Sequence, residues 1–112
     1  MNKYTELSDF EINKLVVYHY IKGNGFTEET SKFISDKGKF DPCNNPADAM
    51  PIIKDNYISI TYDGIAWDVS CVKYPELSVW DGCENYNDNF YRKAMELFLL
   101  MKDAENEINN KR

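Results

Sequence analysis

The sequence lacks any long run of apolar residues. No segment of its 112 residues approaches the roughly 20 consecutive apolar residues that a membrane-spanning helix needs. The segment from Met1 to Glu6 also lacks the apolar core of a secretory signal peptide. We therefore expect a cytoplasmic protein that does not contact a membrane.

Motifs for metal or nucleotide chemistry are also missing. The three cysteines, Cys43, Cys71 and Cys83, form no C-x-x-C pair, and His19 is the only histidine. A structural zinc site needs four such ligands, and an odd number of separated cysteines does not suggest a disulfide framework. Gly23 to Gly25 follows a predicted helix, not a strand, and so indicates a turn instead of a phosphate-binding loop. We expect reduced thiols, no metal and no other cofactor.

Clusters of Lys and Arg are absent as well. The chain has 13 Lys and Arg against 19 Asp and Glu, a formal net charge of −6. Binding driven by counterion release from nucleic acid needs clustered positive charge, so we expect no direct sequence-specific binding to nucleic acid. An acidic surface keeps a small protein soluble, and it is also suited to docking on a basic protein groove, even one that holds nucleic acid.

The apolar content suffices for one folded domain. Hydrophobic residues make up 43% of the chain and aromatic residues 14%, which at this length supports a single core. We predict one domain over residues 1–112, with a charged tail that frays after about residue 105.

A first helix is predicted after Ser8. Ser8 is the expected N-cap and Glu11 its reciprocal partner in a capping box, with Leu7 and Ile12 as a hydrophobic staple. Spacing at three and four residues indicates the buried face. That face comprises Ile12, Leu15, Val16 and His19, with Phe10 and Tyr18 at its edges, and Gly23 is expected to end the helix.

The next signals are mixed. Residues 23–39 favour a strand near 32–40, although Thr27 to Glu29 are equally able to start a short helix. Asn45 is the expected N-cap of a middle helix that has Pro46 in its first position. Pro51 removes a hydrogen bond inside such a helix, so we predict either a Pro-kinked middle helix or a second helix that starts near Pro51.

A β-hairpin is predicted over about residues 57–72. Tyr57–Tyr62 alternates and is rich in β-branched and aromatic residues, and Asp63-Gly64 matches a two-residue type I′ turn. With that loop, one face of the hairpin would lie against the helices. This face would combine Ile58 and Ile60 with Ile65, Trp67, Val69 and Cys71.

A long surface connection is predicted over residues 73–88, with Trp80 and Tyr86 as anchors or, for Trp80, as an exposed contact residue. Asn89 is the expected cap of a last helix that is apolar nearly all round. Such a helix is either central to the core or shared with a second copy in a homodimer. The element order predicts an α+β fold, in which a small antiparallel sheet, made of the hairpin and the strand near 32–40, packs with three helices.

Phe40 to Ile53 is the most unusual stretch, with three prolines, two adjacent asparagines and a cysteine. One interpretation is structural, namely an Asx turn followed by a helix cap. Another is a ligand site, in which amides at the Pro46 helix start bind an anion and Trp67 or Tyr62 stacks on it; Asp41 and Asp48 would oppose an anion there. The candidate binding residues are Asp41, Cys43, Asn44, Asn45, Asp48, Trp67 and Trp80.

A thiol enzyme is a third interpretation of this stretch. Cys43 and His19 form the one conceivable thiol–imidazole pair, with Asn44, Asn45 or Asp41 able to orient the ring. A packed histidine and a buried thiol are the commoner roles of these residue types. We therefore predict no catalytic residues.

Three segments together resemble the NinX-like phage proteins: residues 7–16, residues 40–53, and the last helix from Asn89, with Arg92, Ala94, Met95, Phe98 and Leu99. The family has no known function and comes from tailed phages and prophages of enteric bacteria. The resemblance implies a phage or prophage origin, life in the cytoplasm of an infected or lysogenic host, and similarity to small αβα-sandwich domains. The chain differs at Met50, where the family pattern has tryptophan, and at Phe90, where it has proline, and residues 23–39 and 73–88 do not match.

These observations favour a phage accessory protein that acts by binding a host protein and not by catalysis. Inhibition of a host defence system, such as a CRISPR complex or a nucleotide-signalling pathway, is the specific hypothesis. The first alternative is a small-ligand protein that sequesters a nucleotide or another anion at the Asn45-Pro46 helix start. The second is a Cys43-dependent enzyme.

Overall fold

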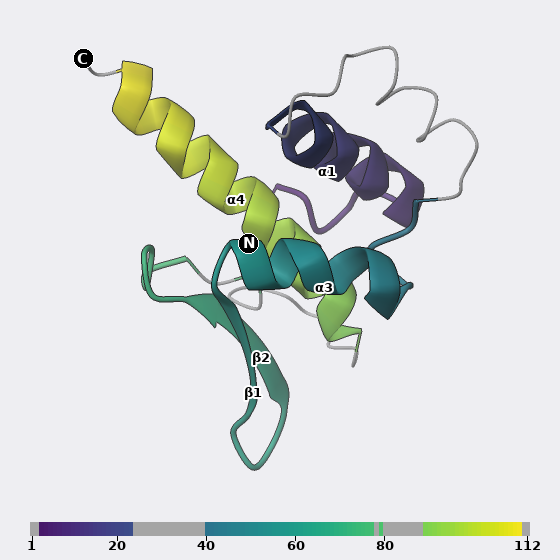
Figure 1. Cartoon of the computed structure of the whole chain (residues 1–112). Coiled ribbons are helices and arrows are strands. Elements are labelled where there is room, and N and C mark those ends of the chain that lie inside the picture. The colour runs from purple at the N-terminus through teal and green to yellow at the C-terminus, as the bar shows by residue number, and fades with distance from the viewer. Residues whose placement is uncertain (1–2, 24–39, 78, 80–88, 111–112) are drawn as a thin grey trace.

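Helix α4 (Phe90–Asn110) is the element on which the others pack (Figure 1). The computed structural model describes residues 3–23, 40–77, 79 and 89–110. Helices α1 (Asp9–Gly23) and α3 (Pro46–Asp55) and strands β1 (Ile58–Tyr62) and β2 (Trp67–Cys71) all contact α4.

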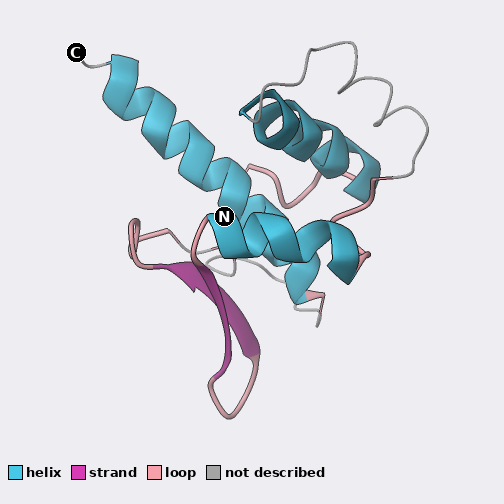
Figure 2. Cartoon of the chain, viewed as in Figure 1, coloured by secondary structure: helices cyan, strands magenta, loops and turns pink. Residues whose placement is uncertain are grey.

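These elements form an α+β fold, as predicted (Figure 2). The two strands are antiparallel neighbours. The strand predicted near 32–40 lies outside the described residues apart from Phe40, which is in neither a helix nor a strand. Within the described ranges, no helix is long and apolar enough to cross a membrane.

Helix α4 has the burial of a central helix. Every residue from Arg92 to Leu99 is buried, on all sides of the helix. This is the first of the two arrangements predicted for an all-round apolar helix. The helix continues to Asn110, past the point near residue 105 at which the sequence predicts fraying.

The predicted start of α1 is confirmed, and its buried face agrees with the prediction at Ile12 and Val16 but not at Leu15. The Glu11 amide donates to Ser8 Oγ at 3.1 Å and the Ser8 amide donates to Glu11 Oε1 at 3.3 Å, which completes the capping box. The buried face is rotated away from Leu15, which is exposed, because the helix buries the polar Asn13 against residues 41–43. The buried residues are Ile12, Asn13, Val16 and Val17, whereas Phe10 and Tyr18 are exposed and His19 is half-buried.

Helix α3 begins as predicted and runs unbroken through Pro51. Asn45 is the N-cap, and its Oδ1 accepts from the Ala47 amide at 3.0 Å, with Pro46 in the first turn. Pro51 leaves the Ala47 carbonyl without its usual helical donor. Both residues face solvent, where water is able to hydrate that carbonyl. One helix therefore forms, and no second helix starts at Pro51.

The hairpin has a wider turn than predicted. Tyr62 pairs with Trp67, so the loop contains four residues, Asp63 to Ala66. Asp63 Oδ1 accepts from the amides of Ile65 and Ala66, both at 2.8 Å, and Gly64 has a φ of 96°. This double acceptor stabilises the four-residue loop over the tight type I′ turn.

The change of register shifts the pairing by two residues, so each strand keeps its predicted face. Ile58 pairs with Cys71 and Ile60 with Val69 on the side that packs against α4. The prediction for Ile65 was wrong: it lies in the turn and is 89% exposed.

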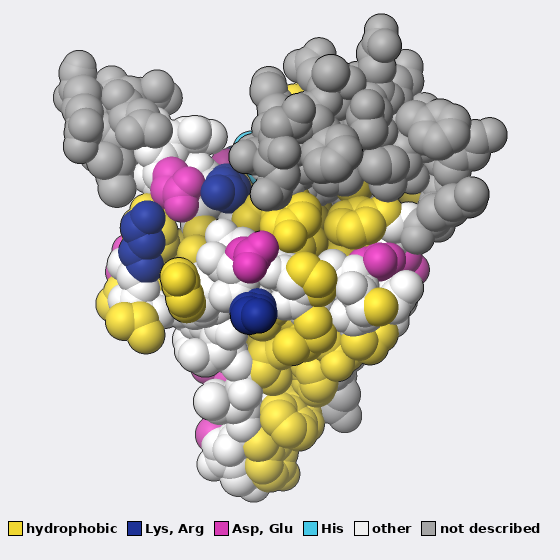
Figure 3. Space-filling view, viewed as in Figure 1, with side chains coloured by type: hydrophobic (Ala, Val, Ile, Leu, Met, Phe, Trp, Pro, Cys, Tyr) yellow, Lys and Arg dark blue, Asp and Glu magenta, His cyan; other side chains and the backbone are white. Residues whose placement is uncertain are grey.

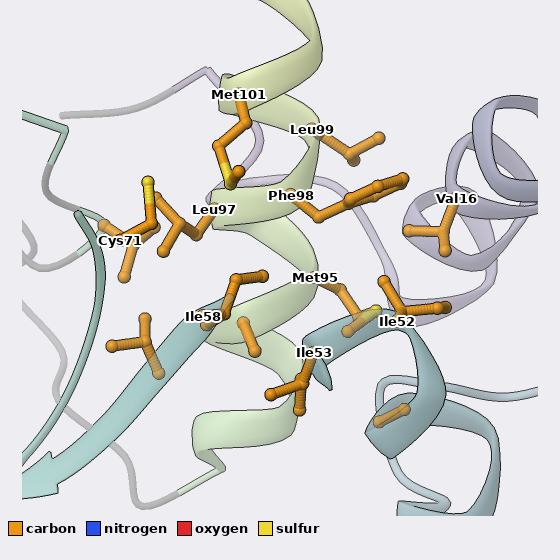
Figure 4. Close-up of a cluster of buried hydrophobic side chains, with 14 of the residues drawn as sticks. Val16, Ile52, Ile53, Ile58, Cys71, Met95, Leu97, Phe98, Leu99 and Met101 are labelled. Carbon is orange, nitrogen blue, oxygen red and sulfur yellow. The ribbon is translucent and has the colours of Figure 1, made fainter. Parts of the chain in front are cut away.

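The core lies where α4 meets the other four elements (Figure 4). Phe98 and Met95 of α4 point toward α1 and α3, while Leu97 lies toward Ile58 and Cys71 of the hairpin (Figure 4). These residues belong to one buried cluster. The core therefore fixes the start of α4 and the base of the hairpin.

Candidate functional site

Arg92, in the first turn of α4, joins the start of this helix to the N-terminal part of the described chain. Its side chain is only 10% exposed. Nη1 donates to Asp9 Oδ1 at 2.6 Å, Nε donates to Glu96 Oε2 at 2.7 Å, and Nη2 donates to the carbonyl oxygens of Leu7 and Tyr4 at 2.7 and 3.0 Å. One guanidinium thus positions the N-terminal segment and the start of α1 on α4.

The charges around Arg92 balance. Glu96 is fully buried, and Lys93 Nζ lies 3.3 Å from Glu96 Oε2, so two cations face Glu96 and Asp9. A buried carboxylate without such partners would carry a large desolvation cost. Burial opposes the ionised form of Asp9, but hydrogen bonds from Asn44 and Arg92 outweigh it and hold the pKa of Asp9 below its ordinary value.

The unusual segment forms a turn at Asp41–Asn45. The amides of Asn44 and Asn45 donate to the Asp41 carbonyl at 3.1 and 2.7 Å, and the Asp41 amide donates to Asp48 Oδ2 at 2.9 Å. Asn13 of α1 braces this turn: its Nδ2 donates to Asp41 Oδ1 at 2.7 Å, and its Oδ1 accepts from the Cys43 amide at 3.2 Å. The turn is therefore held by its own side chains and by α1.

Asn44 connects the turn to both helices. Its Nδ2 donates to Asp9 Oδ2 at 3.0 Å and to Asp41 Oδ2 at 3.2 Å. Its Oδ1 accepts from Asn89 Nδ2 at 3.2 Å. Asn89 also caps α4 as predicted, because its Oδ1 accepts from the Arg92 amide at 3.1 Å. We call the set Asp9, Asn13, Asp41, Cys43, Asn44, Asn89, Arg92 and Glu96 the polar network.

The structure brings together five of the seven candidate residues, Asp41, Cys43, Asn44, Asn45 and Asp48, each of which forms hydrogen bonds to other groups of the protein. Trp67 belongs to a different cluster, with Tyr62 and Phe90. Trp80 lies outside the described residues, as do Cys83 and Tyr86.

The start of α3 offers an anion few donors. Pro46 has no N–H, the Ala47 amide donates to the Asn45 side chain, and the amides of Asp48 and Ala49 both donate to the Asn45 carbonyl at 3.0 Å. Each amide of the first turn therefore already has an acceptor within the chain. An anion would have to displace these bonds, with the Asp48 carboxylate beside it.

Cys43 has the surroundings of a structural thiol. It is fully buried and its Sγ lies 3.8 Å from the carbonyl oxygen of Asp9. Burial, reinforced by the charge of Asp9, raises the pKa of Cys43 to about 12. His19 is ten residues further along α1 than Asp9, about 15 Å at the helical rise per residue. The imidazole is therefore too far from the thiol to accept its proton.

Neither the Cys43 surroundings nor the other described residues form a metal site. Within the described ranges, no group of three or more His, Cys, Asp or Glu side chains is arranged to hold a metal ion.

The second notable region is the hairpin, whose apolar face extends beyond the part that packs against α4. At the base, Ile58 and Cys71 are buried against α4. At the outer pair, the Trp67 ring lies 5.1 Å from that of Phe90, the first residue of α4, and 5.3 Å from that of Tyr62, which is 57% exposed. Beyond this pair lies Ile65. Apolar side chains thus continue from the body to the end of the hairpin (Figure 3).

Sequence reasoning missed the centre of the polar network. It treated Arg92 only as part of a family pattern and assigned no role to Asn13 or to the carboxylate of Asp9. One signal was available: Arg92 and Glu96 are four residues apart on an otherwise apolar helix, the spacing of a helical ion pair. The partner on α1 lies 83 residues away in sequence and leaves no local signal.

The comparisons with known proteins agree with the resemblance found in the sequence. A family model described as bacteriophage P22, NinX, matches residues 3–102, a range that includes α1, α3 and the hairpin in full and most of α4. No curated protein and no solved structure matches the chain significantly. The chain belongs to the bacteriophage P22 NinX family, whose function is unknown.

Proposed function

We propose that this member of the NinX family acts by binding a host protein and not by catalysis. The observation that carries the proposal is the exposed apolar end of the hairpin, where Tyr62 is 57% and Ile65 is 89% exposed. These two side chains lie mostly in solvent, outside the buried core, and contiguous apolar surface of this kind commonly marks a contact with another molecule.

The polar network also favours binding over catalysis. Asn13, Asn44 and Arg92 direct their hydrogen bonds to the protein itself. The one candidate nucleophile, Cys43, is buried and its pKa is raised, whereas a reactive thiol is partly exposed and has a lowered pKa. These contacts give the unusual segment a role in folding. The exposed surface is then the better candidate for binding a partner.

Membership of a phage family suggests what the bound protein does. A small protein made during infection or lysogeny gains most by blocking a host component, so we propose a host defence system, such as a CRISPR complex or a nucleotide-signalling pathway, as the target. This proposal places the protein in the host cytoplasm. Sequestration of a nucleotide or another anion is the lesser alternative, because the amides at the start of α3 already have acceptors.

A phage-challenge assay tests the proposal. Host cells with an active CRISPR system would express the wild-type protein, Ile65→Asp or Val72→Ser, and plaque formation by a targeted phage would be counted. We expect the wild type and Val72→Ser to restore plaques and Ile65→Asp to fail. Val72 is the matched control because it is also highly exposed but lies at the other end of the hairpin. No effect of the wild type on this or on a nucleotide-signalling system, with no host protein co-purifying, would reject the proposal.

The enzyme alternative has its own test. We expect Cys43→Ala to retain the activity measured in the phage challenge, provided that circular dichroism shows it folded. A folded Cys43→Ala variant without activity would favour thiol chemistry over binding.

A further inference from the structure

We infer that the outer end of the hairpin inserts into an apolar pocket of the partner protein, and that the rim of this pocket carries Lys or Arg side chains. The tip surface is defined as Tyr62, Asp63, Ile65 and Trp67. The inference rests on the proposed function and adds to it the surface that binds and the chemistry of the partner.

The apolar part of the tip surface is suited to a pocket. Ile65 lies in the turn and Tyr62 at the end of β1, so two apolar side chains project from one narrow end of the molecule. In Figure 3 the apolar surface continues along the hairpin to this end. Aromatic and large aliphatic side chains that fill a pocket supply most of the energy at interfaces of this kind.

The tip is also held in a defined direction before binding. The Trp67 ring contacts Tyr62 on one side and Phe90 on the other, and so links the outer strand pair to the first residue of α4. The turn is fixed by the two amides that donate to Asp63 Oδ1. A surface ordered in advance loses less conformational entropy when it binds.

Charge identifies the partner as basic. From Ile58 to Val72 the only charged residues are Asp63 and Asp68, and both are acidic. Hydrogen bonds from the amides of Ala66 and Ile65 hold the pKa of Asp63 below its ordinary value, so its carboxylate is ionised at the tip. Lys or Arg beside the pocket would complement the Asp63 carboxylate at the tip, and Asp68, on the opposite face of β2 from Trp67, adds negative charge nearby.

The same charges disfavour two other partners of this surface, a second copy of the chain and a nucleic acid. In a homodimer built on this surface, two copies of Asp63 would approach one another, and the chain already carries a net charge of −6. Like charges across an interface are destabilising. A nucleic acid would meet the same repulsion from its phosphates.

Site-specific photo-crosslinking in host cells tests where the partner binds. A benzophenone amino acid would replace Ile65 in one variant and Tyr18 in another. Tyr18 is the matched control because it is an exposed aromatic residue on α1. We expect a crosslinked host protein from position 65, attached at an apolar pocket that Lys or Arg borders, and much less of it from position 18.

The other outcomes separate this inference from the proposed function. A host protein captured from position 18 but not from position 65 would overturn the inference and leave the proposed function standing. Capture from neither position would count against both. A crosslink from position 65 to a second copy of the chain, or to a site without basic residues, would overturn the inference.

Affinity measurements with the captured protein, purified, then test the role of charge. Asp63→Asn/Asp68→Asn removes both charges and keeps the Asp63 oxygen that accepts from Ile65 and Ala66, so the turn is retained. We expect it to bind about tenfold more weakly at low salt, with a flatter dependence on salt. Glu6→Gln/Glu107→Gln removes two exposed charges elsewhere and should bind like the wild type. Equal weakening by both pairs would reject a basic rim at the tip.

Discussion

The polar network and the tip surface differ in two ways: how unusual their sequences are, and how much of each region is exposed to solvent. The polar network includes residues of the rarest pattern in the chain and joins them by hydrogen bonds to carbonyl, amide and carboxylate groups of the protein. The tip surface is built from an ordinary hairpin pattern and leaves its apolar side chains in solvent. The difference teaches that a distinctive motif can be required for folding, while the contact surface is compositionally plain.

The physical reason lies in what each region has to satisfy. A buried polar group needs a specific partner at a specific distance, because an unpaired one costs about 1–3 kcal/mol. The buried members of the network are therefore restricted by several others at once; they are Asn13, Cys43, Arg92 and Glu96. An exposed apolar side chain has no such requirement inside the chain, so only a partner would restrict its identity.

Replacing Arg92 is expected to have the largest effect on this comparison. Arg92→Met removes a guanidinium that is 10% exposed, and with it one of the cations that face Glu96 and a donor to the carbonyls of Tyr4, Thr5 and Leu7. We expect the free energy of unfolding to fall by about 3–5 kcal/mol, the range for breaking a buried pair. Urea denaturation followed by tryptophan fluorescence measures this loss.

Two controls show whether the loss comes from the network. Lys54→Met also replaces a long cationic side chain by Met, but at an exposed position of α3, and should alter stability by less than about 0.5 kcal/mol. Arg92→Met/Lys93→Met/Glu96→Met removes all three buried charges of this cluster and should recover part of the loss. A stability change for Arg92→Met no larger than that of Lys54→Met would show that the network does not stabilise the fold.

Asn13→Ala is expected to have the next largest effect. It leaves the buried Cys43 amide without an acceptor and removes a 2.7 Å hydrogen bond to Asp41. We expect a loss of about 2 kcal/mol, together with faster labelling of Cys43 by a thiol reagent in a Cys71→Ser/Cys83→Ser background. Unchanged stability and unchanged labelling would mean that α1 does not hold the turn.

The parts of this fold that are set by nearby residues could be predicted from the sequence. The Ser8–Glu11 capping box, the Asn45 cap and the Asn89 cap each depend on residues at most three positions apart, and all three are present. The hairpin faces were also predictable, since alternation survives a register shift of two residues.

Features set by distant residues could not be predicted. Which side of α1 is buried depends on Asn13 meeting residues 41–43, and an amphipathic pattern favours Leu15 over a polar residue there. The Asp9–Arg92 bond joins residues 83 positions apart. The width of the hairpin turn depended on one carboxylate oxygen that accepts two amides, a detail that the Asp-Gly pattern does not specify.

Asp9→Asn should produce a smaller effect that depends on pH. The pKa of Asp9 is lowered in the folded protein, so ionised Asp9 adds stability at neutral pH, and this contribution is lost as the pH falls from about 5 through the lowered pKa. Because the side chain is 43% exposed, solvent screening limits the contribution to about 1 kcal/mol or less. Urea denaturation between pH 3 and pH 7 should therefore show a shallower acid loss for Asp9→Asn, and curves that stay parallel would contradict this.

The smallest effect is expected at the tip surface, where Ile65→Ser should leave the free energy of unfolding within about 0.5 kcal/mol of the wild type. Ile65 is 89% exposed, so the substitution removes almost no buried apolar area, and the bonds to Asp63 Oδ1 involve its backbone and not its side chain. Urea denaturation measures stability, and the phage challenge measures activity in the same variant. Unchanged stability with lost activity is the pattern that separates the tip from the network, where stability and activity should fall together. A destabilised Ile65→Ser would mean that the exposed end of the hairpin supports the fold after all, and the contrast between the two regions would disappear.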